Sequence, residues 1–126
     1  MKVPILKQGN FLIASIQGAL TDTDLTSLQE DLVRSVRKNR STGVIIDVTV
    51  LDVMDSFAAR TLRSISIMAR LMGANLVIVG IQPDVAFTMV QLGLKLDGTM
   101  TSLDLENGIA MLKASDQHHK RSDHEP

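Results

Sequence analysis

The sequence has no cysteine, tryptophan or tyrosine, and it has only three phenylalanines. Without cysteine the chain cannot form disulfides, thiolate metal sites or a cysteine nucleophile, and it suits a reducing compartment. The scarcity of aromatic side chains predicts a core of Leu, Ile and Val, supplemented by the seven methionines. All three histidines, His118, His119 and His124, lie close to the C-terminus. The rest of the chain therefore lacks the side chain that most often serves as a general base.

Strong net charge and long apolar runs are also missing. The 13 Lys and Arg residues nearly balance the 14 Asp and Glu residues, so net charge gives no reason to expect nucleic acid or an anionic membrane as a partner. No apolar run approaches the ~20 residues that cross a bilayer, and the N-terminus lacks the apolar stretch and cleavage site of a signal peptide. A Gly-rich phosphate loop of either standard spacing is absent as well. We therefore expect a cytoplasmic protein that binds neither membrane nor nucleic acid.

The sequence does contain an alternation of short β-branched segments and amphipathic segments with helical spacing. Ile5–Gln8 and Phe11–Ile16 flank a Gly9-Asn10 turn, which predicts an N-terminal β-hairpin. Beyond the hairpin, strands alternate with helices, which predicts right-handed βαβ crossovers. The expected fold class is α/β, with a mixed, mostly parallel sheet of four to five strands and about four helices. The expected later strands are 44–48, 75–79 and 99–103, and the expected helices begin near residues 25, 56, 83 and 105.

The C-terminal residues differ in composition from the rest of the chain. From Ser115 to Pro126 there is no apolar residue, so these residues cannot bury enough surface to offset the entropy lost on ordering. We expect a folded domain over residues 1–114 and a disordered polar tail over residues 115–126. The His118-His119 pair in this tail could bind a metal adventitiously, but a solvated tail is the simpler interpretation.

The stretch from Val44 to Met72 is the most informative part of the sequence. It begins with an apolar strand, passes through a short acidic turn at residues 52–55, and continues as a helix that begins at Ser56. One stripe of apolar residues on this helix is expected to face the core. The stripe comprises Ala58, Leu62, Ile65, Ala69 and Met72.

Loops that follow parallel strands gather at one edge of a sheet, where ligands and partners usually bind. Residues 18–24, 49–55 and 80–83 should meet at this edge, and Ser56 directly follows the second of these loops. Its hydroxyl could cap the helix, a contribution of roughly 1 kcal/mol. Alternatively it could accept a phosphoryl group, which the positive end of the helix dipole favours. Asp52 and Asp55 would then make the phosphorylated surface strongly anionic.

Acidic residues around the same edge offer a further alternative. The candidate catalytic or magnesium-binding set is Asp22, Asp24, Asp47, Asp52 and Asp55. Carboxylates in such loops more often cap helices or form turns. The primary expectation is therefore no enzymatic activity, no cofactor and no metal. A small nucleotide- or anion-binding enzyme that uses this acidic edge stays open as an alternative.

A family resemblance is carried by four segments: Ile45-Ile46-Asp47-Val48-Thr49, Val53-Met54-Asp55-Ser56-Phe57, Leu71-Met72-Gly73-Ala74 and Gly80-Ile81-Gln82-Pro83. They resemble the STAS domain of sulfate transporters and anti-sigma factor antagonists, and more closely the RsbS-type stressosome antagonists. The resemblance runs from about Val3 to Lys113. It implies a STAS fold and a non-enzymatic, phosphorylatable scaffold in a large cytoplasmic complex for bacterial stress signalling.

The resemblance also implies partners and a switch. Such a scaffold holds an RsbT-type serine kinase inactive, self-associates through its STAS domain, and assembles with RsbR-type sensor paralogues. Stress leads the kinase to phosphorylate the serine that corresponds to Ser56, which releases the kinase, and an RsbX-type phosphatase resets the serine. With the resemblance included, the residues expected to bind the partner are Asp55, Phe57, Thr21, Asp22, Gln82 and Pro83.

The residues after Ser56 depart from one branch of the family. In antagonists that act directly on anti-sigma factors, the serine is commonly followed by another small residue and Gly-Leu, whereas Phe57, Ala58 and Ala59 follow here. The resemblance therefore favours the scaffold over the alternative of a direct anti-sigma factor antagonist. That alternative would form a one-to-one complex with its target and no megadalton assembly.

Overall fold

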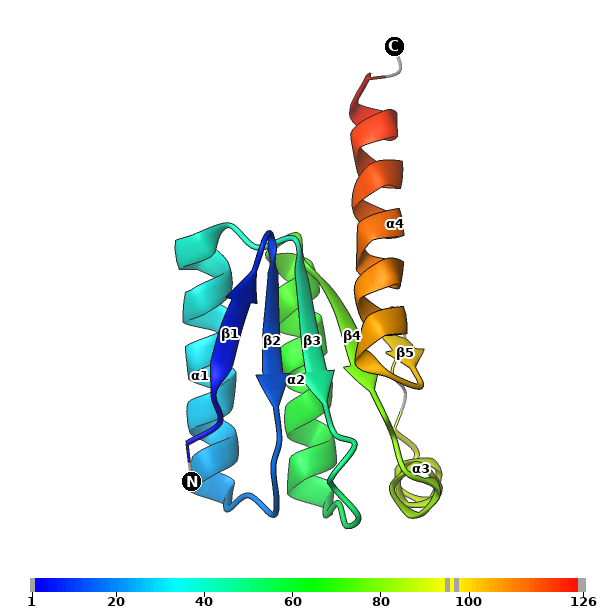
Figure 1. The fold of residues 1–126 in the computed structure, drawn as a ribbon. Coiled ribbons are helices and arrows are strands. Elements are labelled where there is room, and N and C mark those ends of the chain that lie inside the picture. The colour runs from blue at the N-terminus through cyan, green and yellow to red at the C-terminus, as the bar shows by residue number, and fades with distance from the viewer. Residues whose placement is uncertain (1, 95, 97, 125–126) are drawn as a thin grey trace.

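A computed structural model describes residues 2–94, 96 and 98–124 of the chain. These residues form one five-stranded sheet with strand order β1-β2-β3-β4-β5, together with four helices (Figure 1). The strands are β1 (Ile5–Gln8), β2 (Phe11–Ser15), β3 (Gly43–Asp47), β4 (Asn75–Val79) and β5 (Met100–Ser102). The helices are α1 (Asp22–Asn39), α2 (Ser56–Leu71), α3 (Pro83–Gln91) and α4 (Leu105–His124). The expected α/β class is confirmed.

The strands pair as the alternation of segments predicted. β1 and β2 are antiparallel and form a hairpin across the turn at Gly9 and Asn10. Gly9 has a φ of 59°, a left-handed conformation that glycine adopts without steric cost. From β2 to β5 every neighbouring pair is parallel, and a helix connects each pair. The carboxyl ends of these strands consequently lie at the same edge of the sheet, the lower edge in Figure 1.

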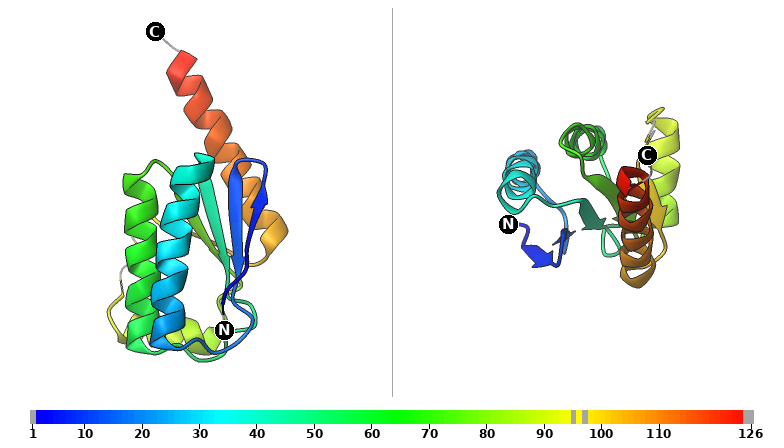
Figure 2. Two further views of the ribbon diagram at one scale, coloured as in Figure 1. Left: turned by 90° about the vertical axis from the view of Figure 1, so that its left-hand side faces the viewer. Right: turned by 90° about the horizontal axis from the view of Figure 1, so that it is seen from above.

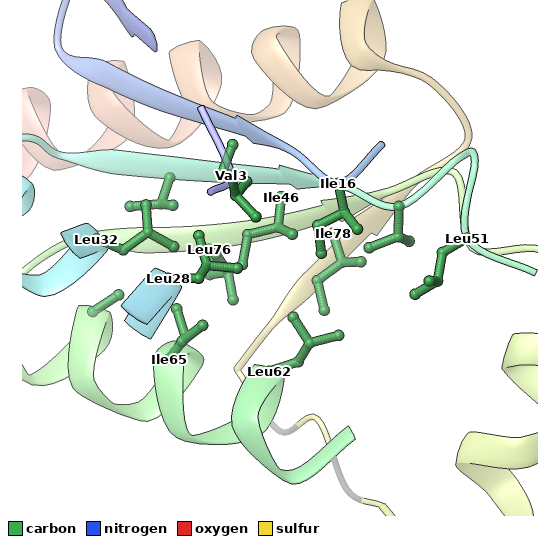
Figure 3. Packing of buried hydrophobic residues seen from close by; sticks show 14 of the residues in the cluster. Val3, Ile16, Leu28, Leu32, Ile46, Leu51, Leu62, Ile65, Leu76 and Ile78 are labelled. Carbon is green, nitrogen blue, oxygen red and sulfur yellow. The ribbon is translucent and has the colours of Figure 1, made fainter. Parts of the chain in front are cut away.

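The larger core lies between the sheet and helices α1 and α2. Side chains alternate between the two faces of a strand, so Ile46 of β3 and Leu76 and Ile78 of β4 point toward these helices (Figure 3). The labelled members of this core are Val3, Ile16, Leu28, Leu32, Ile46, Leu51, Leu62, Ile65, Leu76 and Ile78. All are aliphatic, which agrees with the core expected from the scarcity of aromatic residues.

A second, smaller core lies on the opposite face of the sheet, beneath α4 (Figure 2, left). Ile45, Val77 and Val79 are fully buried there and pack with Leu112 of α4. A Cβ on Gly43 would lie 2.7 Å from a methyl carbon of Leu112, so glycine at this position allows α4 to approach β3. Because both faces are covered, β3 and β4 are apolar at nearly every position.

The buried face of α2 is rotated relative to the expected stripe. Leu62, Ile65 and Ala69 are buried as expected, whereas Ala58 is half-buried and Met72 is 38% exposed. The other buried residues of the helix are Ala59, Thr61 and Ser66. The hydroxyls of the last two are hydrogen-bonded, to the Phe57 carbonyl at 2.8 Å and to the Thr99 hydroxyl. Hydroxyl groups that form hydrogen bonds can be buried. The pattern of apolar residues alone therefore did not predict which residues of α2 face the core.

The expectation of a disordered tail from residue 115 is corrected by helix α4, which continues to His124 and projects past the hairpin end of the sheet (Figure 1). Ser115 accepts a hydrogen bond from the Asn75 side chain at 2.8 Å, and Asp116 accepts one from the Thr42 hydroxyl at 2.9 Å. A helix that has been nucleated by packing grows by one hydrogen bond per added residue. Helix α4 can therefore continue beyond the residues whose apolar spacing predicted it. Residues 125–126 lie outside the described part of the chain.

Candidate functional site

The candidate site lies at the edge of the sheet where the parallel strands end. The backbone N–H of Val48, just after β3, donates to the carbonyl of Val79 at the end of β4, and Ile16 N–H donates to the Asp47 carbonyl, both at 2.9 Å. These bonds bring the loops after β2, β3 and β4 together. The expected convergence of the three loops at one edge is therefore present in the fold.

Asp55, and not Ser56, is the N-cap of α2. The Asp55 backbone is extended, and its carboxylate accepts a hydrogen bond from the backbone N–H of Ala58 at 2.8 Å. Ser56 is the first helical residue and is exposed. The backbone N–H groups of Ser56 and Phe57 have no partner within the helix, as helix geometry dictates. With the cap supplied by Asp55, the Ser56 hydroxyl makes no hydrogen bond to any other described residue.

The loop between β3 and α2 is held in place from within. Leu51 and Met54 are buried in the larger core, with exposed fractions of 9% and 5%. Asp47 Oδ1 accepts hydrogen bonds from the Thr49 backbone N–H at 2.9 Å and from the Thr49 hydroxyl at 2.6 Å. Asp47 is thus a turn-forming residue, an arrangement typical of aspartate at strand ends.

The loop after β4 also contacts the loop between β3 and α2, through a hydrogen bond that we call the clamp. The Gln82 side-chain amide donates a hydrogen bond to the Thr49 carbonyl at 2.6 Å. Gly80 has a φ of 77°, and a Cβ there would overlap the Thr49 hydroxyl. Gln82, which the sequence predicted as a docking residue, therefore has a contact that positions the loop leading to Ser56. Pro83 is exposed at the first position of α3.

The remaining residues expected to bind a partner have different surroundings. Thr21 is the N-cap of α1, and it forms a capping box with Asp24: the Asp24 N–H donates to the Thr21 hydroxyl at 3.1 Å, and the Thr21 N–H donates to Asp24 Oδ2 at 3.0 Å. Asp22 is exposed in the first turn of α1. Phe57 is half-buried and lines a shallow depression between α1 and α2. Thr21 and Asp22 are thus accessible, and Phe57 is partly so; their role in partner binding stays a prediction.

An apolar groove that the sequence did not reveal lies beside Ser56. It encloses about 140 Å³ and is formed by the loops after β2 and β3 and the start of α2. Its lining residues are Ile16, Ala19, Leu20, Leu25, Leu51, Val53, Met54, Asp55, Ala58 and Leu62. The available signal was the presence of Leu20 and Val53 in polar loops, but only the fold brings the two loops together.

The charged groups at this edge share one sign. Residues 8–33, 41–59 and 71–94 contain no Lys or Arg, and they include all three loops. Asp22, Asp52, Asp55 and Asp84 are exposed there. Among the described residues, no group of three His, Cys, Asp or Glu is arranged to hold a metal ion. The carboxylates of the acidic alternative are spread over separate caps and turns, so they do not converge on a common ligand position.

None of the described helices is long and apolar enough to span a bilayer. Residues 2–104 match the STAS domain family. The RsbT co-antagonist protein RsbRA of Bacillus subtilis (strain 168) is 32% identical over 107 residues, which are 85% of this chain and 38% of RsbRA. The chain therefore corresponds to well under half the length of this relative.

Two solved structures are similar along nearly the whole chain. RsbS of Moorella thermoacetica, solved with a serine-to-glutamate substitution, has a TM-score of 0.83 and 34% identity, and the match covers 93% of this chain and 99% of RsbS. A component of the stressosome, a signal integration and transduction hub, has a TM-score of 0.76 and 34% identity, with 90% and 98% covered. The resemblance expected from the four sequence segments is confirmed: this chain belongs to the STAS domain family.

Proposed function

We propose that this chain is a non-enzymatic stressosome scaffold that holds an RsbT-type serine kinase inactive and releases it when Ser56 is phosphorylated. One observation carries the proposal. The Asp55 carboxylate caps α2, which leaves the neighbouring Ser56 hydroxyl exposed and without a hydrogen bond to the described residues. A kinase can reach this hydroxyl without unfolding the helix or breaking its cap.

The position of Ser56 accounts for both tolerance of the phosphate and its effect on a partner. Phosphoserine carries nearly two negative charges at neutral pH, and the N–H groups and dipole of the first helical turn stabilise such a charge. The fold should therefore change little. The surrounding loops lack cations, and a bound kinase brings the phosphates of its nucleotide to the same place. Repulsion among these anionic groups would weaken the complex.

The proposed partners follow from the relatives. Similarity to a stressosome component and to RsbRA supports self-association through the STAS domain and assembly with RsbR-type sensors. The name of RsbRA, a co-antagonist of RsbT, supports an RsbT-type kinase as the sequestered partner. We include an RsbX-type phosphatase because a reversible switch needs an enzyme that removes the phosphate. Asp22 and Pro83 are exposed at the same edge and complete the proposed docking surface.

Substitution of Ser56 tests the switch. Ser56→Asp should weaken binding of a purified RsbT-type kinase by roughly tenfold or more, whereas Ser56→Ala should retain binding and resist phosphorylation. Light scattering should give the same assembly mass for both variants as for wild type. Ser27→Asp introduces the same charge at an exposed serine of α1 and is the matched control. Equal affinity of the kinase for wild type and Ser56→Asp would contradict the proposal.

The same samples distinguish the two alternatives. A direct anti-sigma factor antagonist would bind its target one to one and would not form a large assembly, which light scattering detects. A small nucleotide- or anion-binding enzyme would show saturable ligand binding and turnover that Asp52→Asn abolishes. Assembly without turnover is the result expected for a scaffold.

A further inference from the structure

The apolar groove beside Ser56 is a depression of the described surface that lies at the loop edge of the sheet. Val53 at its lip is 74% exposed, and Ala19 on the opposite loop is exposed as well. It is lined in part by Ile16, Leu51 and Leu62, which are buried members of the larger core. A preformed apolar surface of this kind can receive a group without rearrangement of the backbone.

The volume of the groove limits what it can hold. Its 140 Å³ is close to the volume of an engineered protein cavity of about 150 Å³ that binds benzene. One large apolar side chain such as Leu, Met or Phe fits this space. A nucleotide does not, and the aliphatic lining offers no partners for its polar groups.

The rim of the groove identifies the chemistry of the molecule that carries this side chain. Asp55 lines the groove, Asp52 is exposed next to Val53, and Asp22 is exposed at the start of α1. The loops that form the groove contain no Lys or Arg. Apolar anchors surrounded by charges of one sign are complemented by a partner surface of the opposite sign.

We propose that the groove receives one large apolar side chain from a basic segment of the kinase and so fixes the register of the kinase over Ser56. The inference rests on the proposed function and adds the anchor and its chemistry. Asp55, which directly precedes Ser56, and Ala58, two residues after it, both line the groove. A side chain seated there holds the partner's active site next to the hydroxyl that it phosphorylates. Anchoring and phosphorylation therefore use adjacent but separate surfaces.

Filling the groove tests the anchor. Ala19→Leu places additional methyl groups at the groove from an exposed loop position, so we expect normal thermal unfolding and a roughly tenfold or larger loss of affinity for a purified RsbT-type kinase. Ala110→Leu, at an exposed alanine of α4 on the other face of the sheet, is the matched control. If the kinase binds Ala19→Leu as tightly as wild type, the anchor is refuted. If Ala19→Leu changes the assembly mass and not kinase affinity, the groove is a contact between copies of this chain.

Reversing a rim charge tests the basic character of the partner segment. Asp52→Lys should weaken kinase binding and reduce its dependence on salt concentration, whereas Glu30→Lys, an exposed acid in the middle of α1, should do neither. Native mass spectrometry of the purified chain should show no bound small apolar molecule, and finding one in the groove would overturn the proposal. The groove proposal and the proposed switch at Ser56 can fail independently. If only the groove proposal is wrong, Ser56→Asp would still weaken kinase binding.

Discussion

At the scale of single residues, Asp55 and Ser56 differ in role because the helix begins between them. Asp55 has extended backbone and uses its carboxylate to cap the Ala58 N–H, while Ser56 has helical backbone and an exposed side chain. A serine at the cap itself would have its hydroxyl engaged with the backbone. One position further along, the hydroxyl is accessible and still lies in the field of the helix N-terminus. The aspartate before the serine therefore leaves the serine hydroxyl accessible, as the proposed phosphorylation requires.

Gly80 is the residue at this edge with the sharpest steric requirement. Gly80 and Gly93 have φ angles of 77° and 64°, so alanine at either position would adopt a conformation that costs roughly 1–2 kcal/mol. At Gly80 the new Cβ would also lie 3.0 Å from Thr49 Cα, a backbone clash that rotation of the threonine side chain cannot relieve. A Cβ at Gly93 would meet nothing within 4 Å.

Gly80→Ala should therefore destabilise the domain more than Gly93→Ala. We expect a decrease in the free energy of unfolding of about 1 kcal/mol for Gly93→Ala and about 3 kcal/mol for Gly80→Ala. Urea denaturation followed by circular dichroism measures both values. Similar losses for the two variants would mean that the loop after β3 moves aside at little cost, and the loop would then be less rigid than its contacts indicate.

At the scale of elements, periodicity in the sequence predicted the helices and strands because burial of one face or both faces leaves a regular apolar pattern. Periodicity predicted less well the residues that are buried although they are polar, and the helical residues that are not buried. Thr61 and Ser66 are buried with their hydroxyls hydrogen-bonded, and α4 continues for several turns after Leu112 although residues 115–124 include no apolar side chain. The clamp from Gln82 to Thr49 also lay beyond prediction, since it joins residues that are far apart in the sequence.

The clamp has a consequence for the loop that leads to Ser56. Gln82→Ala removes the hydrogen bond to the Thr49 carbonyl, and a net effect of about 1 kcal/mol is typical of such a bond. We expect faster amide hydrogen exchange across residues 49–55, with little change in α1 or α4. Gln91→Ala, at the exposed end of α3, is the control. Unchanged exchange in residues 49–55 would show that the buried Leu51 and Met54 side chains hold the loop unaided.

At the scale of the whole molecule, the net charge of −1 conceals an uneven distribution. The three loops of the candidate site carry only acidic charges, while Arg37, Lys38 and Arg40 cluster at the far end of α1. The parallel topology produces this polarity because it places helix N-termini, which favour acidic residues, at one edge of the sheet. The convergence of the loops was predictable from the order of elements. The apolar groove was not, because its volume depends on how side chains from two loops pack.

Helix α4 forms the third layer of the fold, and we predict that the domain needs it for stability. The match to the STAS domain family ends at residue 104, before α4 begins, yet α4 is what covers the second face of the sheet. A chain truncated after Asp104 would expose the fully buried Ile45, Val77 and Val79. Each such side chain contributes about 1.5–3 kcal/mol when buried, and domains of this size are stable by only about 5–15 kcal/mol in total.

Truncation at two positions separates the covering part of α4 from its extension. A chain ending at Asp104 should lose cooperative thermal unfolding and bind hydrophobic dyes, because an apolar sheet face would be open to water. A chain ending at Ala114 keeps Leu112 over the sheet and loses residues 115–124 of α4, and with them the hydrogen bonds of Ser115 and Asp116. It should unfold cooperatively, with a loss of about 1–3 kcal/mol. Cooperative unfolding of the shorter chain would mean that the sheet is stable with one face uncovered, whereas collapse of both chains would place residues 115–124 within the folding unit.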